Sequence, residues 1–163
     1  MENKPDIKDF LTNQHEIFEN VATESLTALF QKKFQIQEPW ILSERLRGEF
    51  DFIISLGSGN DDYQSLIAIG LSKAALDEIV ETDDSTELLD IFGEVGNTYC
   101  GLLLDNKPIT DYFGFLNQSV PQYANEAMYF PKVWCVNGNV YYENTAIYMG
   151  CAMRPVRNLC RPV

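Results

Sequence analysis

The sequence has few of the residues on which common enzyme chemistries depend. Its one histidine is His15, and its four cysteines are Cys100, Cys135, Cys151 and Cys160, of which no pair has the C-x-x-C spacing. The sequence therefore offers few residues from which a Ser-His-Asp triad, a Cys-His pair or a multi-histidine metal site could be built. We expect His15 at the surface or its boundary, and the four thiols buried rather than paired or bound to a metal.

Positive charge and long apolar runs are also scarce. Lysine and arginine number 12 against 24 aspartates and glutamates, which gives a net charge of −12. Such a chain lacks the basic patch that nucleic acids and anionic membranes bind, so we expect neither as a partner. No run reaches the roughly 18 apolar residues of a spanning helix, and residues 1–20 lack a signal-peptide pattern, which predicts a cytoplasmic protein. The acidic surface keeps the protein soluble, or it faces a partner with basic groups.

The first half of the chain alternates helical and strand patterns. The full length of 163 residues corresponds to one domain with its own core. Apolar residues recur at helical spacing over 10–33, and Ser72 is placed to cap a short helix over 73–80. Between these segments the sequence predicts strands over 40–46, 50–56 and 63–72.

The second half opens with a helix that begins after an N-cap in the stretch 83–85 and reaches about Leu104. An irregular aromatic segment follows, and then a β-hairpin with its tight turn at Asn137-Gly138. No linker interrupts the chain. We therefore predict one α+β domain over residues 1–163, an antiparallel β-sheet with long helices packed on one face. Its peripheral tails are expected at about 1–9 and 156–163.

The stretch ELLDIFGEVGNTYCGLLLD, residues 87–105, reads as a strong helix that nevertheless contains Gly93 and Gly96. Each interior glycine costs a helix about 1 kcal/mol relative to alanine. On a helix the apolar residues form one stripe, the expected core face: Leu88, Phe92, Val95, Tyr99 and Leu102. A second stripe lies roughly opposite and consists of Asp90, Glu94, Asn97 and Gly101.

Glu94 and Asn97 are three residues apart, so their side chains project together from the second stripe. The neighbouring glycines have no side chains, which permits a close approach to the helix at this point. Either a partner protein uses this clearance, or the helix packs closely on another helix or strand of its own chain.

The string DIFGEVGN resembles the signature of the CheC/CheX/FliY family of chemotaxis phosphatases. That signature is an Asp or Ser, three residues, a Glu, two residues, an Asn, and a Pro some two dozen residues later. Asp90, Glu94 and Asn97 match its spacing, and Pro121 lies one residue beyond the family's interval. The resemblance implies a CheX-like architecture with a pseudo-twofold repeat of helices.

The sequence contains an internal similarity of the kind that such a repeat would leave. Residues 16–30 align with 90–104, with Ile17-Phe18 over Ile91-Phe92 and Val21 over Val95. In this alignment Asn20 stands at the position of Glu94, and Thr23 at that of Asn97. A chance match between two amphipathic helices is the alternative. A single Glu/Asn pair per chain is similar to the CheX type, whereas CheC-type members usually carry two.

The resemblance implies hydrolysis of the aspartyl-phosphate on a CheY-like response-regulator receiver domain. Asn97 would position the attacking water, and Glu94 would dock to the receiver's active-site lysine. The expected partner-binding residues are Asp90, Gly93, Gly96 and Pro121, although Asp90 is as readily explained as an inert exposed residue. No cofactor of its own is implied, since the receiver supplies Mg²⁺. The family resemblance also implies a homodimer through sheet edges.

Two alternatives to a phosphatase, from other functional classes, remain open at this point. One is a non-catalytic CheX-like binding or scaffold module in chemotaxis or two-component signalling. The other is an unrelated small-molecule-binding domain with an aromatic pocket, although such residues more often form a core or an interface. The aromatic residues concerned are Tyr112, Phe113, Phe115, Tyr123, Tyr129 and Phe130.

Overall fold

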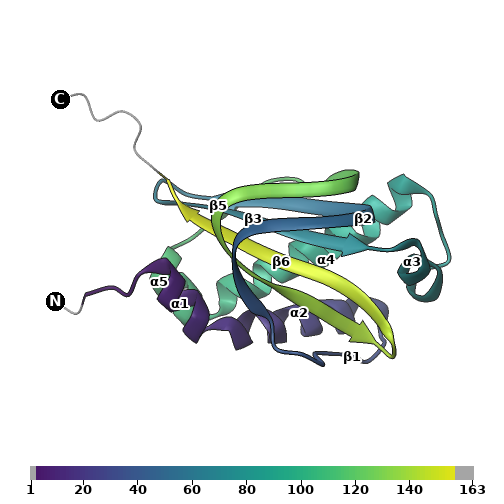
Figure 1. Cartoon of the computed structure of the whole chain (residues 1–163), viewed down its shortest axis with the longest axis horizontal. Coiled ribbons are helices and arrows are strands. Elements are labelled where there is room, and N and C mark those ends of the chain that lie inside the picture. Colours follow the sequence, from purple (N-terminus) through teal and green to yellow (C-terminus); the bar gives the residue numbers. More distant parts are fainter. Residues whose placement is uncertain (1–2, 157–163) are drawn as a thin grey trace.

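The computed structural model describes residues 3–156, except for the side chain of Glu126. Its helices lie along one face of one antiparallel sheet, so the predicted α+β class and the one-sided placement of the helices are confirmed (Figure 1). The elements in chain order are α1 (Ile7–Asn13), α2 (His15–Phe30), β1 (Phe34–Gln35), β2 (Ile41–Gly59), β3 (Tyr63–Leu71), α3 (Lys73–Ile79), α4 (Ser85–Asp105), α5 (Lys107–Phe113), β4 (Asn117–Gln118), β5 (Gln122–Tyr142) and β6 (Thr145–Pro155).

The sheet is built from two equivalent halves. Its strand order is β1-β5-β6-β3-β2-β4, with a further pairing between β2 and β5. If β1 is exchanged with β4, β2 with β5 and β3 with β6, the strand order is unchanged except that it is read from the opposite edge of the sheet. Each half consists of a long helix, a short edge strand, a long strand and a middle strand. The predicted pseudo-twofold architecture is therefore confirmed.

The main core lies between the sheet and the paired helices α2 and α4. Phe18 and Val21 of α2 are buried in the same cluster as Phe92 and Val95 of α4. These are the residues that the internal similarity aligns, so the two helices bury equivalent faces in the core. Each such side chain stabilises the fold by about 1.5–3 kcal/mol when fully buried. The hydroxyl of Tyr99 donates to the carbonyl of Phe18 across the helix pair (3.4 Å).

A second, smaller core covers the opposite face of the middle strands. The long strands β2 and β5 extend past β3 and β6, pair with each other and lie over them (Figure 1). Glycines make this close approach possible, because a Cβ atom at Gly70 would lie 2.5 Å from Phe50, and one at Gly150 would lie 2.7 Å from Leu46. The buried residues of this cluster are Leu46, Ala68, Val133, Cys135 and Ala152.

Two predicted element boundaries in the first half are wrong. The segment 10–33 forms two helices, because α1 ends at Asn13 and α2 begins at His15. The predicted strands 40–46 and 50–56 are one continuous strand, β2, whose register against β5 shifts between Ser43 and Arg45 and again between Phe50 and Ile53. Neither feature is marked by a proline or a turn sequence, and the continuity of β2 follows from its pairing with the distant strand β5.

The predicted turn at Asn137-Gly138 is also wrong, because both residues lie within β5. Asn137 pairs with Gly150 and Gly138 with Met149, and the hairpin turns at Glu143-Asn144, with Glu143 in the left-handed region (φ 51°). Gly138 is instead required for packing. A Cβ atom there would lie 2.3 Å from Cδ1 of Trp40.

Local signals located the starts of α3 and α4 correctly. Ser72 caps α3 by accepting from the backbone N–H of Ala75 (3.1 Å), as predicted. Within the stretch 83–85 the cap of α4 is Asp84, which accepts from the N–H groups of Thr86 and Glu87 (2.9 and 3.0 Å). None of the helices in residues 3–156 is long and apolar enough to span a bilayer.

The segments predicted as tails are described in part. From the N-terminal one, Pro5 accepts a hydrogen bond from the hydroxyl of Tyr112 (2.8 Å), and Ile7 begins α1. At the other end the N–H of Val156 donates to the carbonyl of Asp62 (2.7 Å). Residues 157–163 lie outside the described part of the chain.

Replacing Gly138 by alanine is expected to destabilise the protein by about 1–3 kcal/mol, because the new methyl group forces Trp40 or β5 to move. Urea unfolding followed by circular dichroism would measure this as a lower midpoint at an unchanged slope. An Asn144→Ala variant, at an exposed position of the actual turn, serves as the control. A wild-type midpoint for Gly138→Ala would contradict the assignment.

Candidate functional site

The side of α4 that faces away from the core carries the predicted polar pair. Asp90 and Glu94 are exposed and Asn97 is half-buried, whereas Phe92 and Val95 between them are fully buried. The two predicted stripes of this helix are therefore found on opposite sides. Glu94 and Asn97 lie one turn apart and are open to an incoming protein.

Pro121 lies on the same turn of α4, at Gly93. A Cβ atom at Gly93 would lie 3.1 and 3.2 Å from Cγ and Cβ of Pro121, which is tighter than ordinary van der Waals contact. The connection between β4 and β5 can lie this close to the helix only because residue 93 has no side chain. The structure thus brings together Gly93, Glu94 and Pro121, which the sequence connects only by spacing.

The role assigned to the two glycines needs correction. We expected Gly93 and Gly96 to leave room for a partner, but both are buried within the chain itself. At Gly93 the space is taken by Pro121. At Gly96 a Cβ atom would lie 3.7 Å from Cδ2 of Leu56 of β2, an ordinary van der Waals distance, so an alanine would also fit there. Gly93 therefore serves close packing, the second of the two interpretations drawn from the sequence, and Gly96 is buried without a contact that requires glycine.

Gln118 is the residue of this site that sequence reasoning missed. Its side-chain Nε2 donates a hydrogen bond to Oδ1 of Asn97. Gln118 belongs to β4, a two-residue edge strand that pairs with β2 at Ser58. No local pattern marks it, because the strand is short and lies in a stretch that the sequence describes only as irregular and aromatic.

The surface around the pair is acidic. Glu94 and Asp90 follow three exposed acidic residues at the start of α4, namely Asp83, Asp84 and Glu87. Within residues 3–156 the ion pairs are His15–Glu19 and Lys107–Asp111, so neither Glu94 nor Asp90 is neutralised by a described side chain. A carboxylate that is free and exposed can receive a basic group from another protein.

The equivalent face of α2 is built differently. Glu19 occupies the position of Gly93, is buried, and accepts from the backbone N–H of Trp40 (2.6 Å) while facing Nδ1 of His15 (3.3 Å). The hydroxyl of Thr23, at the position of Asn97, donates to the carbonyl of Glu19 (3.0 Å). The described part of the chain therefore carries one Glu/Asn pair. His15, with its side chain 35% exposed, lies at the surface boundary as predicted.

The described cysteines are free, buried thiols, as predicted for Cys100, Cys135 and Cys151, while Cys160 lies outside the described residues. Burial raises the pKa of Cys100 and of Cys151 to about 12, so both are neutral thiols at physiological pH. Cys151 is in hydrogen-bond contact with the hydroxyl of Ser65 (3.7 Å). None of the three is activated as a nucleophile.

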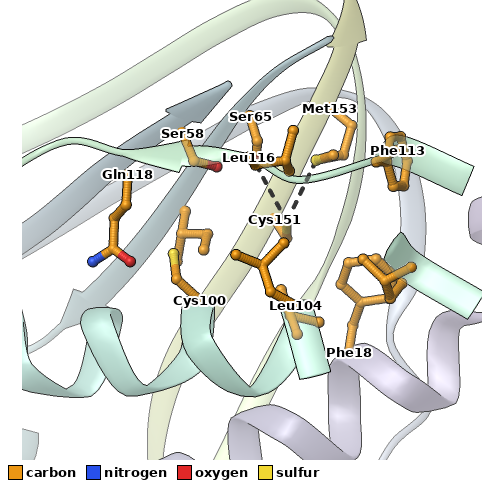
Figure 2. A pocket seen from close by; sticks show the side chains of 13 residues that line it. Phe18, Ser58, Ser65, Cys100, Leu104, Phe113, Leu116, Gln118, Cys151 and Met153 are labelled. Atoms are coloured by element: carbon orange, nitrogen blue, oxygen red, sulfur yellow. Dashed lines mark hydrogen bonds between the residues drawn. The ribbon is translucent and has the colours of Figure 1, made fainter. Parts of the chain in front are cut away.

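A small apolar pocket lies beneath the site, between α4 and the sheet (Figure 2). Cys100, Leu104, Cys151 and Met153 line it, and Gln118 lies at its edge. In residues 3–156 no group of three or more His, Cys, Asp or Glu side chains is arranged to hold a metal ion.

The aromatic residues of 112–130 do not form one pocket. Tyr112 and Phe113 pack against Phe10 of α1, at centroid distances of 4.0 and 5.4 Å. Tyr123 lies against Phe52 in the sheet (4.7 Å), and Phe115 is 71% exposed. Because these residues lie in different parts of the fold, some in the core and some at the surface, they do not support an aromatic ligand site.

Comparison with known proteins finds similarity in the fold alone. Neither the sequence models of protein families nor the curated proteins give a match. Among solved structures, the chemotaxis protein CheX from Vibrio vulnificus superposes with a TM-score of 0.67 at 11% identity, over 90% of this chain and 99% of that one. A chemotaxis protein CheX from Desulfovibrio desulfuricans gives a TM-score of 0.63 at 12% identity, over 87% and 99%.

A third similar structure is the CheX–CheY–BeF3–Mg²⁺ complex from Borrelia burgdorferi. It superposes with a TM-score of 0.56 at 12% identity, over 85% of this chain and 96% of that one. The chain therefore has the CheX-like fold, over most of its own length and nearly all of theirs. The fold that the DIFGEVGN motif implied is confirmed.

Alanine at Gly93 and at Gly101 should have different effects, although both glycines interrupt the same helix. Nothing lies within 4 Å of a Cβ atom at exposed Gly101, so Gly101→Ala should raise the free energy of unfolding by about 0.5–1 kcal/mol. Gly93→Ala should gain little or lose stability, because Pro121 must move by a few tenths of an ångström. Urea unfolding of both variants compares them, and equal gains would show that Pro121 does not constrain Gly93.

The three described thiols should be protected from modification in the folded protein. In a Cys160→Ser background, Ellman's reagent at pH 8 should react with them only after denaturant is added, because burial disfavours the thiolate. Rapid modification of one thiol in the native protein would contradict the burial of Cys100, Cys135 and Cys151.

Proposed function

We propose that this protein hydrolyses the aspartyl-phosphate of a CheY-like receiver domain. The observation that carries the proposal is the solvent-facing pair of Glu94 and Asn97 on one turn of α4, in a chain with the CheX-like fold. The CheX–CheY complex, whose CheX subunit has the same fold, supports a receiver domain as the partner.

Asn97 has the chemistry to position the attacking water. An acyl phosphate is already reactive, so its hydrolysis is accelerated mainly by placing water in line with the phosphorus atom. A side-chain amide can both accept from and donate to that water, and it does not compete with the water as a nucleophile. The reaction therefore needs no histidine, and the one histidine of the chain lies on α2, in the other half of the fold.

Glu94 would dock the receiver. In the proposed complex its carboxylate pairs with the receiver's active-site lysine, and this charge-assisted contact sets the register of α4 in the phosphorylation site. The acidic residues before it on α4 add to the attraction for a basic group. The Mg²⁺ used in the reaction belongs to the receiver, and this chain contributes Glu94 and Asn97. Partner binding by Asp90 and the formation of a homodimer through sheet edges stay predictions.

Asn97→Ala should abolish the acceleration, with a loss of about 100-fold or more in the maximal rate and little change in receiver binding. Glu94→Ala should weaken binding about tenfold and also slow turnover. The measurement is the decay of a CheY-type receiver domain, phosphorylated with acetyl phosphate, over a range of receiver concentrations.

Asn20→Ala is the matched control, since Asn20 is exposed on α2 at the position that aligns with Glu94. It should behave as the wild type. If Asn97→Ala were as active as the wild type, the mechanism would be wrong. Tight receiver binding by the wild type without faster decay would instead identify a binding or scaffold module.

A further inference from the structure

We infer that Gln118 is a positioning residue for this site, acting through the hydrogen bond that its side-chain amide donates to Oδ1 of Asn97. The inference rests on the proposed function, in which Asn97 positions water, and it adds a residue that the Glu/Asn motif does not contain. Figure 2 shows the side chain of Gln118 extending from its edge strand toward the helix that carries Cys100, which is α4.

The segment that carries Gln118 is fixed at both of its ends. Before it, Leu116 is buried in the main core, at 6% exposure. After it, Pro121 lies against Gly93 of α4. The four residues between Leu116 and Pro121 are held by a packed residue at each end and have little freedom to move, so the position of residue 118 is well defined although its side chain is exposed.

Ser119 adds a second attachment to the sheet. Its N–H donates to the carbonyl of Gly57 (2.8 Å), and its hydroxyl oxygen accepts from the N–H of Gly57 (3.0 Å). These bonds continue the pairing of Gln118 with Ser58 of β2. The backbone on both sides of the Gln118 side chain is therefore held by the sheet. The sheet thereby provides a rigid support for the bond to Asn97.

The bond restricts the amide that the reaction uses. A free, half-exposed asparagine samples several rotamers and both orientations of its amide. Donation from Gln118 occupies one lone pair of Asn97 Oδ1 and selects one orientation. The second lone pair of Oδ1 and both N–H groups of Nδ2 stay available to water or to a phosphoryl oxygen. Holding a reacting group by a second residue in this way is a general means of preorganising a site.

The pseudo-twofold repeat provides an internal comparison. Gln35 of β1 and Gln118 of β4 occupy equivalent edge strands. In the first half, however, the side chain at the position of Asn97 is Thr23, whose hydroxyl donates to its own helix at Glu19. The amide–amide bond therefore occurs in the half of the molecule that has the Glu/Asn pair, and it is not a general consequence of the fold.

The test uses Gln118→Met, which keeps the length of the side chain and removes its N–H donors, and Gln118→Glu, which keeps the shape and can only accept at neutral pH. Both should lower the maximal rate of receiver dephosphorylation about five- to tenfold, the value of one ordinary hydrogen bond, with an unchanged KM for the receiver. Gln122→Met is the matched control, because Gln122 is exposed in the next strand, and it should keep the wild-type rate.

Two further measurements separate positioning from a general loss of structure. In an Asn97→Ala background, Gln118→Met should cause no additional loss, because its effect passes through Asn97. NMR relaxation of the Asn97 side-chain amide should show greater mobility in Gln118→Met than in the wild type, a readout that needs no receiver.

The outcomes distinguish this inference from the proposed function. If the wild type accelerates decay and Gln118→Met does so equally, or if the Asn97 amide is equally rigid in both, the inference is overturned and the proposed function stands. Full activity in Gln118→Glu with reduced activity in Gln118→Met would overturn donation to Asn97 as the cause. An inactive wild type would overturn the proposed function, and with it the role of Gln118 in that reaction.

Discussion

The contact between Pro121 and Gly93 connects the second half of the sheet to the helix that carries the polar pair. Because residue 93 has no side chain, the connection between β4 and β5 can lie directly on α4. That approach places Gln118 within hydrogen-bond distance of Asn97. Three residues later, Gly96 faces Leu56 of β2 at a distance that would also accommodate alanine. The position of Glu94 and Asn97 relative to the β4–β5 connection therefore depends on Gly93, which is itself buried.

The two halves of the repeat use the same positions for different purposes. In the first half, Glu19 fills the place of Gly93 and holds the start of β2 through the N–H of Trp40. Its carboxylate is buried and committed to the backbone of its own chain. In the second half the carboxylate is Glu94, one residue further along the aligned helix, and it is exposed and unpaired among the described residues. The fold is symmetric, whereas the exposed Glu/Asn pair occurs in one half of the described residues.

Features set by neighbouring residues were predictable from the sequence, and those set by distant ones were not. The opposite stripes of α4 and the cap at Ser72 depend on spacings of three or four residues, so periodicity and cap chemistry located them. Asn137-Gly138 has the composition of a turn, but it lies in a strand because Trp40, far away in the sequence, packs on Gly138. Gln118 was missed for the same reason, since its partner Asn97 is on another element.

The close packing at α4 also explains how a chain so poor in reactive side chains could support the hydrolytic site proposed for it. A carboxylate and an amide offer no strong nucleophile, so such a pair acts through where it is placed. Placement requires a rigid support, and here Gly93 allows it by letting the β4–β5 connection pack on the helix. An interior glycine weakens the isolated helix by about 1 kcal/mol. At Gly93, however, Pro121 packs against the helix backbone and Gln118 is brought to Asn97, so the glycine that weakens the helix locally also positions its polar pair.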